Sequence, residues 1–535
     1  MIALWVWLVF AFVMGACVGS FLNVVILRLP AGMSLIHPPS HDPATGKKLA
    51  AWENIPILSY LMLGARSRHS GGWISPQYPI VELLTGLMFV WVAWVYYGTA
   101  LRPAFSHDGL EATWPVLLVH LALVAALVAA TVIDARLYII PLTITWFVAV
   151  VAVVVLPVAT ALGYPGHTTV IAFLSQTVGN ATDLRPVSAV PLISDVGMYI
   201  AIGGLIGLVA ANALLMLGVV PRSFDESRLE VLVDASAEPV EDSGEGDAEV
   251  ETDSETDGDG ASEGDEAEES DESAASVWGV SAWVAIGLSA LTAAFLFVGM
   301  ALPKQTYPAA APPAGWFTGM AAAPGLWAIE GTTAGWLLLL AVAAAMAAWA
   351  ALILVGVMAD RADAAEVEAE VTSFPRPRRE ALRELLFIGF PIVGGLMGLA
   401  LAIGQGMIGP GLTAGPAEAP MWAQALGGVV GGYLIGGGVV WVTRVLGTLA
   451  FGREAMGLGD VHLMAAAGAV VGAADATIAF FIAPFFGIAA ALIGIGVTAI
   501  AKGRVRVIPY GPYLALAVVV MLAARVPVHR FLGIL

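Results

Sequence analysis

Long apolar runs recur along the whole chain, and they constrain its fold more than any other feature. Of the 535 residues, 59% are hydrophobic and only 12% are charged, which excludes a soluble domain of this size. Because a helix needs about 20 apolar residues to cross a bilayer, we predict an all-α polytopic integral membrane protein with about twelve transmembrane helices. The predicted spans are residues 3–28, 78–98, 114–134, 139–162, 196–220, 278–302, 334–358, 385–409, 422–446, 461–475, 477–500 and 508–526.

Basic residues predict the orientation of these spans. Lysine and arginine collect in the loops that follow the odd-numbered spans, and basic loops stay on the cytoplasmic side of a membrane. We therefore expect the N-terminus outside and these loops in the cytoplasm. Asp134 ends the third span and Asp460 begins the tenth, so both carboxyls are predicted at the cytoplasmic face.

Composition divides the chain into six segments. Much of the net charge of -19 comes from an acidic block at residues 225–272, which buries too little apolar surface to fold and is predicted to be a disordered linker. Its irregular acid spacing argues against an EF-hand. The segments are a first transmembrane helix (1–29), a small cytoplasmic domain (30–77), membrane helices that carry Asp134 (78–220), the acidic linker (221–277), further helices and loops (278–421) and C-terminal membrane helices that carry Asp460 (422–535).

Two aspartates at span ends are the candidate chemistry. Asp134 precedes Pro141, where one helix stops and the next begins, and Asp460 ends the run Met456-Gly457-Leu458-Gly459-Asp460. The glycines of this run leave room for close approach of backbone or substrate. Two acids within a few ångströms share a proton, so one can activate water while the other donates a proton, as in aspartic proteases. The simpler alternative is that each is a helix-end acid, with Asp460 as an N-cap.

Competing chemistry has little support in the sequence. No Ser/His dyad, G-x-S-x-G elbow, phosphate-binding loop or H-E-x-x-H motif stands out. The single cysteine, Cys17, excludes an internal disulfide and a cysteine-based zinc site.

Five blocks of sequence resemble the type IV prepilin peptidases, the leader peptidases of the A24 aspartic class. The blocks lie at residues 15–30, 51–56, 74–82, 452–463 and 508–515. The resemblance implies cleavage of basic leader peptides from prepilins or pseudopilins at the cytoplasmic face of a bacterial inner membrane. It also implies that Asp134 and Asp460 are the catalytic pair, with Gly457 and Gly459 as active-site backbone, and that residues 30–77 are the family's N-terminal domain.

The resemblance also sets expectations about cofactors and partners. The peptidase reaction needs no cofactor, and S-adenosylmethionine would serve only if the chain also methylates the new N-terminus. Expected partners are the prepilin substrates, the lipid bilayer and pilus or type II secretion assembly proteins, and no nucleic acid is expected.

This chain departs from the family at several positions. Many members bind zinc through two Cys-x-x-Cys pairs, but residues 67–70 read Ser-Arg-His-Ser here, so thiolate zinc binding is not expected. Solvated histidines are favoured over a metal site at His37, His41 and His69. The stretch between the two acids is longer than in the family, which predicts an insertion within residues 221–421.

Three further residues are candidates for contact with the substrate. Glu53 and Glu82 are acids that a basic leader peptide would attract, although a structural role is favoured for both. His462 stands where many relatives have lysine, which makes the surroundings of Asp460 sensitive to pH.

Two other classes of function stay open at this point. A transporter or channel would use Asp134, Asp460 and Asp475 as an ion path. A non-catalytic scaffold for pilus or secretion assembly would account for the insertion.

Overall fold

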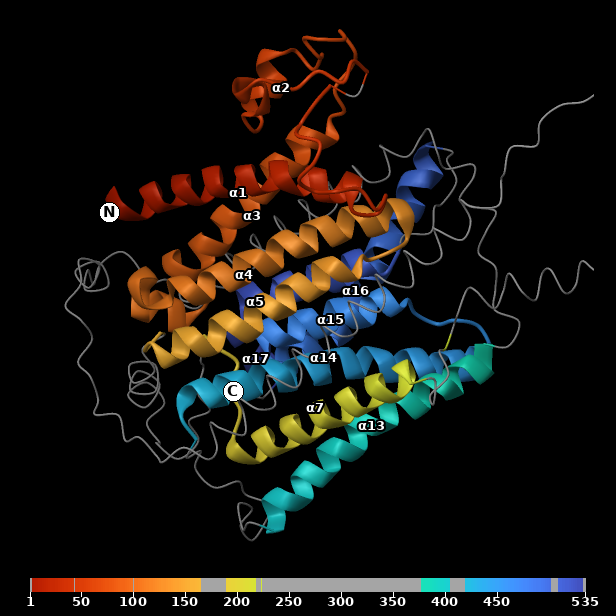
Figure 1. Ribbon diagram of the computed structural model, residues 1–535. Coiled ribbons are helices and arrows are strands. Elements are labelled where there is room, and N and C mark those ends of the chain that lie inside the picture. The colour runs from red at the N-terminus through yellow and green to blue at the C-terminus, as the bar shows by residue number, and fades with distance from the viewer. Residues whose placement is uncertain are drawn as a thin grey trace, which may run out of the picture.

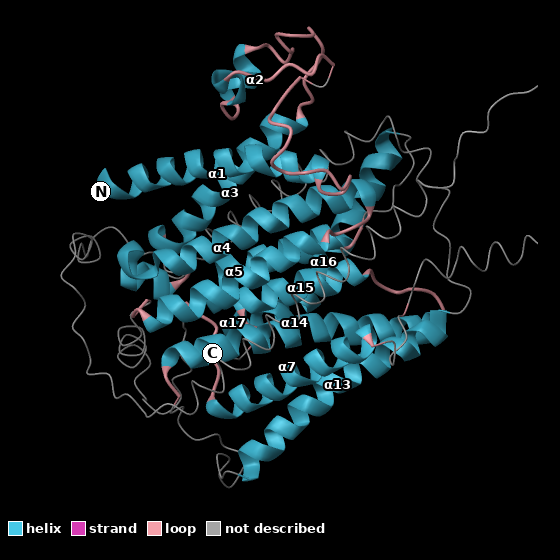
Figure 2. Cartoon of the chain, viewed as in Figure 1, coloured by secondary structure: helices cyan, strands magenta, loops and turns pink. Residues whose placement is uncertain are grey.

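The computed structural model describes residues 2–42, 44–99, 101–164, 189–217, 223, 377–404, 419–501 and 509–532. Helices dominate these residues, and no strand is present among them (Figure 2). Nine described helices are long and apolar enough to cross a membrane, and a tenth, of 14 residues, is apolar but shorter. The prediction of an all-α polytopic membrane protein is confirmed, while the predicted spans at 278–302 and 334–358 and the linker at 221–277 lie almost wholly outside the described residues.

The helix bounds follow the predicted spans closely. The nine long helices and the shorter α15 are α1 (Ile2–Arg28), α3 (Gln77–Gly98), α4 (Pro103–Leu137), α5 (Leu142–Ala161), α7 (Asp195–Met216), α13 (Pro377–Gly404), α14 (Met421–Phe451), α15 (Leu458–Val471), α16 (Ala473–Ala501) and α17 (Gly511–Phe531). The cytoplasmic domain predicted at residues 30–77 contains a short 3-10 helix, Ala51–Asn54, and the short helix α2, Leu58–Met62.

The interior of the bundle forms around α4 and its neighbours. Leu123, Leu127 and Ile133 of α4 are fully buried, and α4 contacts α1, α3, α5, α15 and α17. Large apolar side chains such as Phe147 and Leu396 stay exposed on the outer helices, as contact with lipid requires. The helix whose last turn carries Asp134 is therefore the most deeply buried of the described membrane-length helices.

Small residues bring α14 and α15 close together. A Cβ on Gly432 of α14 would collide with the backbone of Gly468 on α15, and the reverse holds for Gly468. Such close approach is common between membrane helices that carry glycine at the contact. It fixes how α15, which carries Asp460, lies against α14.

Two further helices lie along one edge of the bundle. Figure 1 shows α7 and α13 side by side next to α14. Because α13 belongs to the segment predicted as an insertion, at least this part of the segment packs directly on the C-terminal half.

Candidate active site

Asp134 lies in the last turn of α4, where the helix is stopped by its C-cap. Tyr138 adopts a left-handed conformation (φ 57°), and its N–H donates to the Asp134 carbonyl at 2.9 Å, a common way to end a helix. The chain then reaches Pro141, which directly precedes the first residue of α5. The predicted break between the two helices is therefore present.

Asp460 is the third residue of α15, and Gly457 is the N-cap residue of that helix. The Asp460 carboxylate accepts a hydrogen bond from the Gly457 backbone N–H. An acid at the third position that reaches back to the N-cap N–H is half of a capping box. Asp460 thus supports the start of α15 without being the N-cap itself.

The two carboxyls come together where α4, α15 and α17 meet. The charge of Asp460 acts on Asp134, and the backbone N–H of Gly511, the first residue of α17, faces the Asp134 carboxyl. Asp134 is 5% exposed and Asp460 is 8% exposed. The structure thus brings the two predicted acids into one buried cluster, although their helices are far apart in the sequence.

Two glycines make this approach possible. A Cβ on Gly511 would overlap the Asp134 carboxylate and lie 3.1 Å from Cδ1 of Ile140. A Cβ on Gly459 would lie 2.9 Å from the Ile140 Cβ. Only a residue without a side chain lets α15 and α17 approach the α4–α5 connection this closely.

Gly457 is under no such constraint. Its φ of -68° and ψ of 146° suit any residue, and the nearest atom to an added Cβ is an Asp460 carboxylate oxygen at 3.7 Å. Packing therefore requires Gly459 but not Gly457 in the predicted motif.

Tyr510 is a member of the site that the sequence analysis did not select. It directly precedes α17, and burial raises the pKa of its hydroxyl, with a further rise from the charge of Asp460. Its block of sequence, residues 508–515, carried the family resemblance, but nothing in that pattern indicates that its phenol lies near the acids.

The three candidates for substrate contact lie on three different elements. The Glu82 carboxylate is buried and accepts the backbone N–H of Ile57 at 2.7 Å. The Glu53 carboxylate is also buried and accepts the N–H of Ala50 at 2.7 Å. His462 is half-buried on α15, two residues beyond Asp460. Both glutamates hold backbone groups, the role that was favoured for them, and contact of all three with a substrate stays a prediction.

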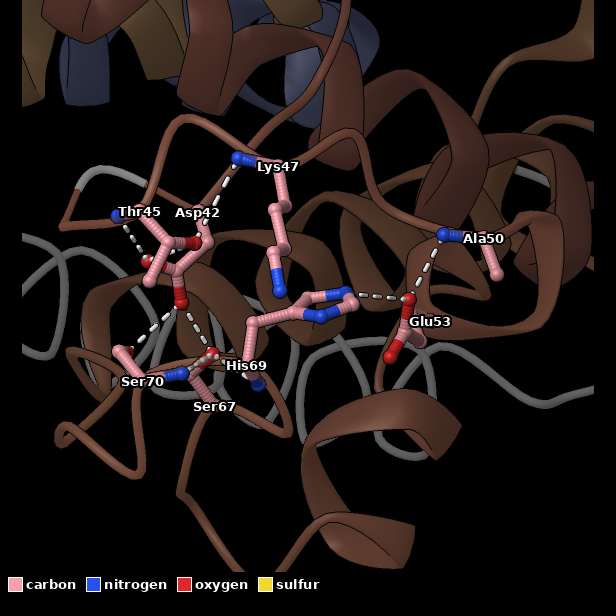
Figure 3. Close-up of polar contacts among 8 residues, drawn as sticks. All are labelled: Asp42, Thr45, Lys47, Ala50, Glu53, Ser67, His69 and Ser70. Carbon is pink, nitrogen blue, oxygen red and sulfur yellow. Dashed lines mark hydrogen bonds and ion pairs between the residues drawn. The ribbon is translucent and has the colours of Figure 1, made fainter.

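Hydrogen bonds hold the predicted cytoplasmic domain together at the positions where many family members have zinc-binding cysteines. His41 and Lys48 form one antiparallel bridge, and Arg66 and Trp73 form another. Asp42 joins the two turns because its carboxylate accepts hydrogen bonds from the hydroxyls of Ser67 and Ser70, the latter at 2.8 Å (Figure 3). We call this set, Asp42 with Ser67 and Ser70, the serine clip.

Asp42 also holds its own turn. Its other carboxylate oxygen accepts the N–H groups of Ala44 at 3.0 Å and Thr45 at 2.9 Å. These hydrogen bonds, led by those from Ser67 and Ser70, hold the pKa of the Asp42 carboxyl well below its usual range.

The residues of this domain do not fit a zinc ion. Among the described residues, no group of three His, Cys, Asp or Glu side chains is placed to hold a metal. His41 lies 2.9 Å from the Pro39 carbonyl through Nδ1, and His69 lies 3.5 Å from the Glu53 carboxylate through Nε2. The serine hydroxyls, which stand at the cysteine positions, are already bonded to Asp42.

Comparison with known proteins adds independent information. Residues 13–96 match the family described as Bacterial Peptidase A24 N-terminal domain. The chain is 44% identical over 137 residues to the Prepilin leader peptidase/N-methyltransferase of Myxococcus xanthus, which covers 26% of this chain and 36% of that protein. It is 46% identical over 104 residues to the protein of the same name from Xanthomonas campestris, covering 15% of this chain and 36% of that protein.

A third relative extends this pattern. The Prepilin leader peptidase/N-methyltransferase of Klebsiella pneumoniae is 46% identical over 90 residues, which covers 16% of this chain and 40% of that protein. The matched regions thus span little more than a third of the length of these relatives, and no solved structure matches the chain. These matches confirm the resemblance carried by the motifs: the chain is similar to prepilin leader peptidases over the matched regions, and residues 13–96 match the N-terminal domain of the bacterial A24 peptidases.

Proposed function

We propose that this protein is a membrane-embedded aspartic endopeptidase that removes basic leader peptides from type IV prepilins or pseudopilins at the cytoplasmic face of a bacterial inner membrane. The proposal is supported by the placement of Asp134 in the last turn of α4 and Asp460 in the first turn of α15, where Gly459 and Gly511 both pack against Ile140 of the α4–α5 connection and the two acids interact electrostatically. The relatedness to prepilin leader peptidases supports the choice of substrate.

Two neighbouring carboxyls can supply both the base and the acid that peptide hydrolysis needs. The ionised acid takes a proton from water while the water oxygen attacks the amide carbonyl. The protonated acid donates its proton as the carbon–nitrogen bond breaks and the amine leaves. Water therefore supplies the nucleophile, and the reaction uses no serine or cysteine.

A processing assay tests this proposal. We expect the purified protein to shorten a prepilin that has a basic leader, a glycine at the cleavage site and an apolar helix after it. Asp134→Asn and Asp460→Asn should insert normally but lose cleavage, by at least about 1000-fold if each acid is essential. Asp195→Asn, which changes an acid in the first turn of α7, is the matched control and should keep cleavage.

The result also separates the other two classes of function. A transporter or channel would leave the prepilin intact and would show ion flux that depends on the same acids. A scaffold would leave the prepilin intact and would support assembly even as the double Asn variant. Near-normal cleavage by either single variant would contradict the role assigned to that acid.

Methylation of the new N-terminus is a second candidate activity. The names of the relatives include N-methyltransferase, and S-adenosylmethionine would be the methyl donor. Mass spectrometry of the mature N-terminal peptide, with and without S-adenosylmethionine, tests this activity separately from cleavage. A peptide that stays unmethylated would limit the protein to the peptidase reaction.

A further inference from the structure

A buried acid on α13 contacts the helix that leads to the Asp460 motif. Glu384 is 3% exposed. Its carboxylate accepts the Trp441 indole N–H at 3.0 Å and the Nε–H of Arg444 at 3.1 Å. Both donors belong to α14, so Glu384 links the helix from the predicted insertion to the C-terminal half.

Arg444 carries this link on to the motif itself. Its side chain is 2% exposed, and its Nη1 donates to the main-chain carbonyl of Met456 and to the carboxylate of Glu454. Met456 directly precedes Gly457, whose N–H donates a hydrogen bond to the Asp460 carboxylate. Glu384 is thus joined to Asp460 through one guanidinium and one short stretch of backbone.

The chemistry of the guanidinium makes this link directional. Arginine presents its N–H groups in a rigid planar fork, so a carboxylate fixed on the Nε side sets where Nη1 points. The loop between α14 and α15 is also bonded to α14 at Thr448, whose carbonyl accepts the Gly452 N–H at 2.9 Å and whose hydroxyl accepts the Ala455 N–H at 3.2 Å. The position of the Met456 carbonyl, and hence of the start of α15, therefore depends on how Arg444 is held.

The packing of α13 fixes Glu384 in turn. Ala381 and Ile388, which flank Glu384 on α13, form an apolar cluster with Val445 of α14. Nearer the start of α13, Arg378 donates to the Leu449 carbonyl at 3.0 Å. In Figure 1 the first turns of α13 lie beside the C-terminal end of α14, where the chain leaves for α15.

We propose that Glu384 is a positioning residue for Asp460, which acts through Arg444 on the Met456 carbonyl. Its effect on cleavage rests on the proposed function, whereas its effect on the loop does not. The proposal gives a task to α13, a helix within the segment predicted as an insertion: it completes the support of the acid that α15 carries.

A labelling experiment tests the effect on the loop. The test protein is the full chain with two substitutions. Cys17→Ala removes its only cysteine, and Met456→Cys places a thiol at a half-buried position of the loop between α14 and α15. The Met456 contact is made by its backbone, so this substitution keeps it. Glu384→Ala should raise the maleimide labelling rate several-fold in detergent.

Glu380→Ala is the matched control. Glu380 is an acid on the same helix, one turn earlier, and it pairs with Arg383 of α13 at 2.6 Å. This variant should leave the labelling rate unchanged. Equal rates for Glu384→Ala and Glu380→Ala would overturn the proposal.

Kinetics on a prepilin test the effect on cleavage. A misplaced Asp460 should lower kcat by about 10- to 100-fold while KM changes little, because Glu384 does not touch the substrate. Glu384→Gln, which keeps an acceptor oxygen for Trp441, should recover part of kcat. A change in KM alone, or kcat equal to that of Glu380→Ala, would contradict a positioning role.

Two arrangements keep the outcomes distinguishable. If Glu384→Ala fails to insert, Arg444→Lys replaces it, because one ammonium cannot bridge Glu384 and the Met456 carbonyl as the fork does, and the same rise in labelling is expected. If the unaltered chain does not cleave prepilin, the proposed function fails, but the labelling rates still decide whether Glu384 positions the loop.

Discussion

Gly457 and Gly459 belong to one short motif, but their surroundings make different demands on them. Gly459 lies against Ile140, where an added Cβ would be only 2.9 Å from another Cβ, whereas an added Cβ on Gly457 meets nothing closer than 3.7 Å. A shared motif can thus contain one glycine that packing requires and one that it does not.

Alanine at each of these positions gives a matched pair of variants. Gly459→Ala should destabilise the protein by about 1–3 kcal/mol, a typical cost of overpacking, and should also lower cleavage because it pushes α15 from the α4–α5 connection. Gly457→Ala should cost less than about 1 kcal/mol, the scale of changes at an N-cap. Thermal unfolding in detergent measures both, and equal losses would contradict this distinction.

Tyr510 allows a second test at this scale. Besides burial, the charge of Asp460 contributes to the raised pKa of the Tyr510 hydroxyl. Tyr510→Phe should therefore lower kcat by up to about tenfold without affecting insertion. Tyr513→Phe, which changes a tyrosine in the first turn of α17, is the control. Identical kinetics for both variants would remove Tyr510 from the site.

The serine clip shows how an element keeps its shape with different chemistry. In the sequence the two serines stand out only because cysteine is missing there, and nothing singles out Asp42, to which both serines donate hydrogen bonds. The sequence could have indicated only that Asp42 begins a turn, because the composition of residues 42–46, Asp-Pro-Ala-Thr-Gly, is typical of an Asx turn. The pairing with Ser67 and Ser70 is a tertiary contact, which turn chemistry alone does not reveal.

The pKa of Asp42 predicts how this domain responds to pH. Since the folded pKa lies below the ordinary value of about 3.9, the stabilisation is complete above about pH 4 and is lost as pH falls through the folded pKa. Asp42→Asn should therefore weaken the domain already at neutral pH. Hydrogen exchange at the Ala44 and Thr45 amides measures this, and equal protection in both proteins at pH 7 would contradict it.

Metal content gives an independent check of the same element. Because the serine hydroxyls are engaged by Asp42, the purified protein should hold much less than one equivalent of zinc, and chelators should leave hydrogen exchange in residues 30–77 unchanged. Elemental analysis after dialysis tests this. One tightly bound zinc per chain would restore the histidine site.

Helix positions were predictable because they follow from apolar length alone. The predicted span at 78–98 differs from α3 by one residue, and that at 422–446 falls within α14. Errors arose at the ends: the helix that reaches Leu137 starts just after Gly109, where φ is 74° and the helical path from Pro103 is interrupted, so it begins before the predicted start at residue 114. Apolar length locates a crossing but not the turns of helix that continue beyond it.

The arrangement of the whole bundle brings the two aspartates together, and only part of it could be predicted. The cytoplasmic side assigned from the basic loops stays a prediction, whereas the pairing of Asp134 with Asp460 was expected from the chemistry of two acids. The close packing around Gly511, the nearby Tyr510 and the link from Glu384 depend on which helices are neighbours. No pattern along a single helix specifies these contacts.

The central claim is that Asp134 and Asp460 act as one catalytic unit, and a double-variant cycle on prepilin cleavage tests it most directly. Residues that work as a unit have strongly non-additive effects. The account predicts that the Asp134→Asn/Asp460→Asn protein is no slower than either single variant, each of which is already reduced to background. If one single variant keeps substantial cleavage, or if the two losses multiply in the double variant, the two acids do not form one site.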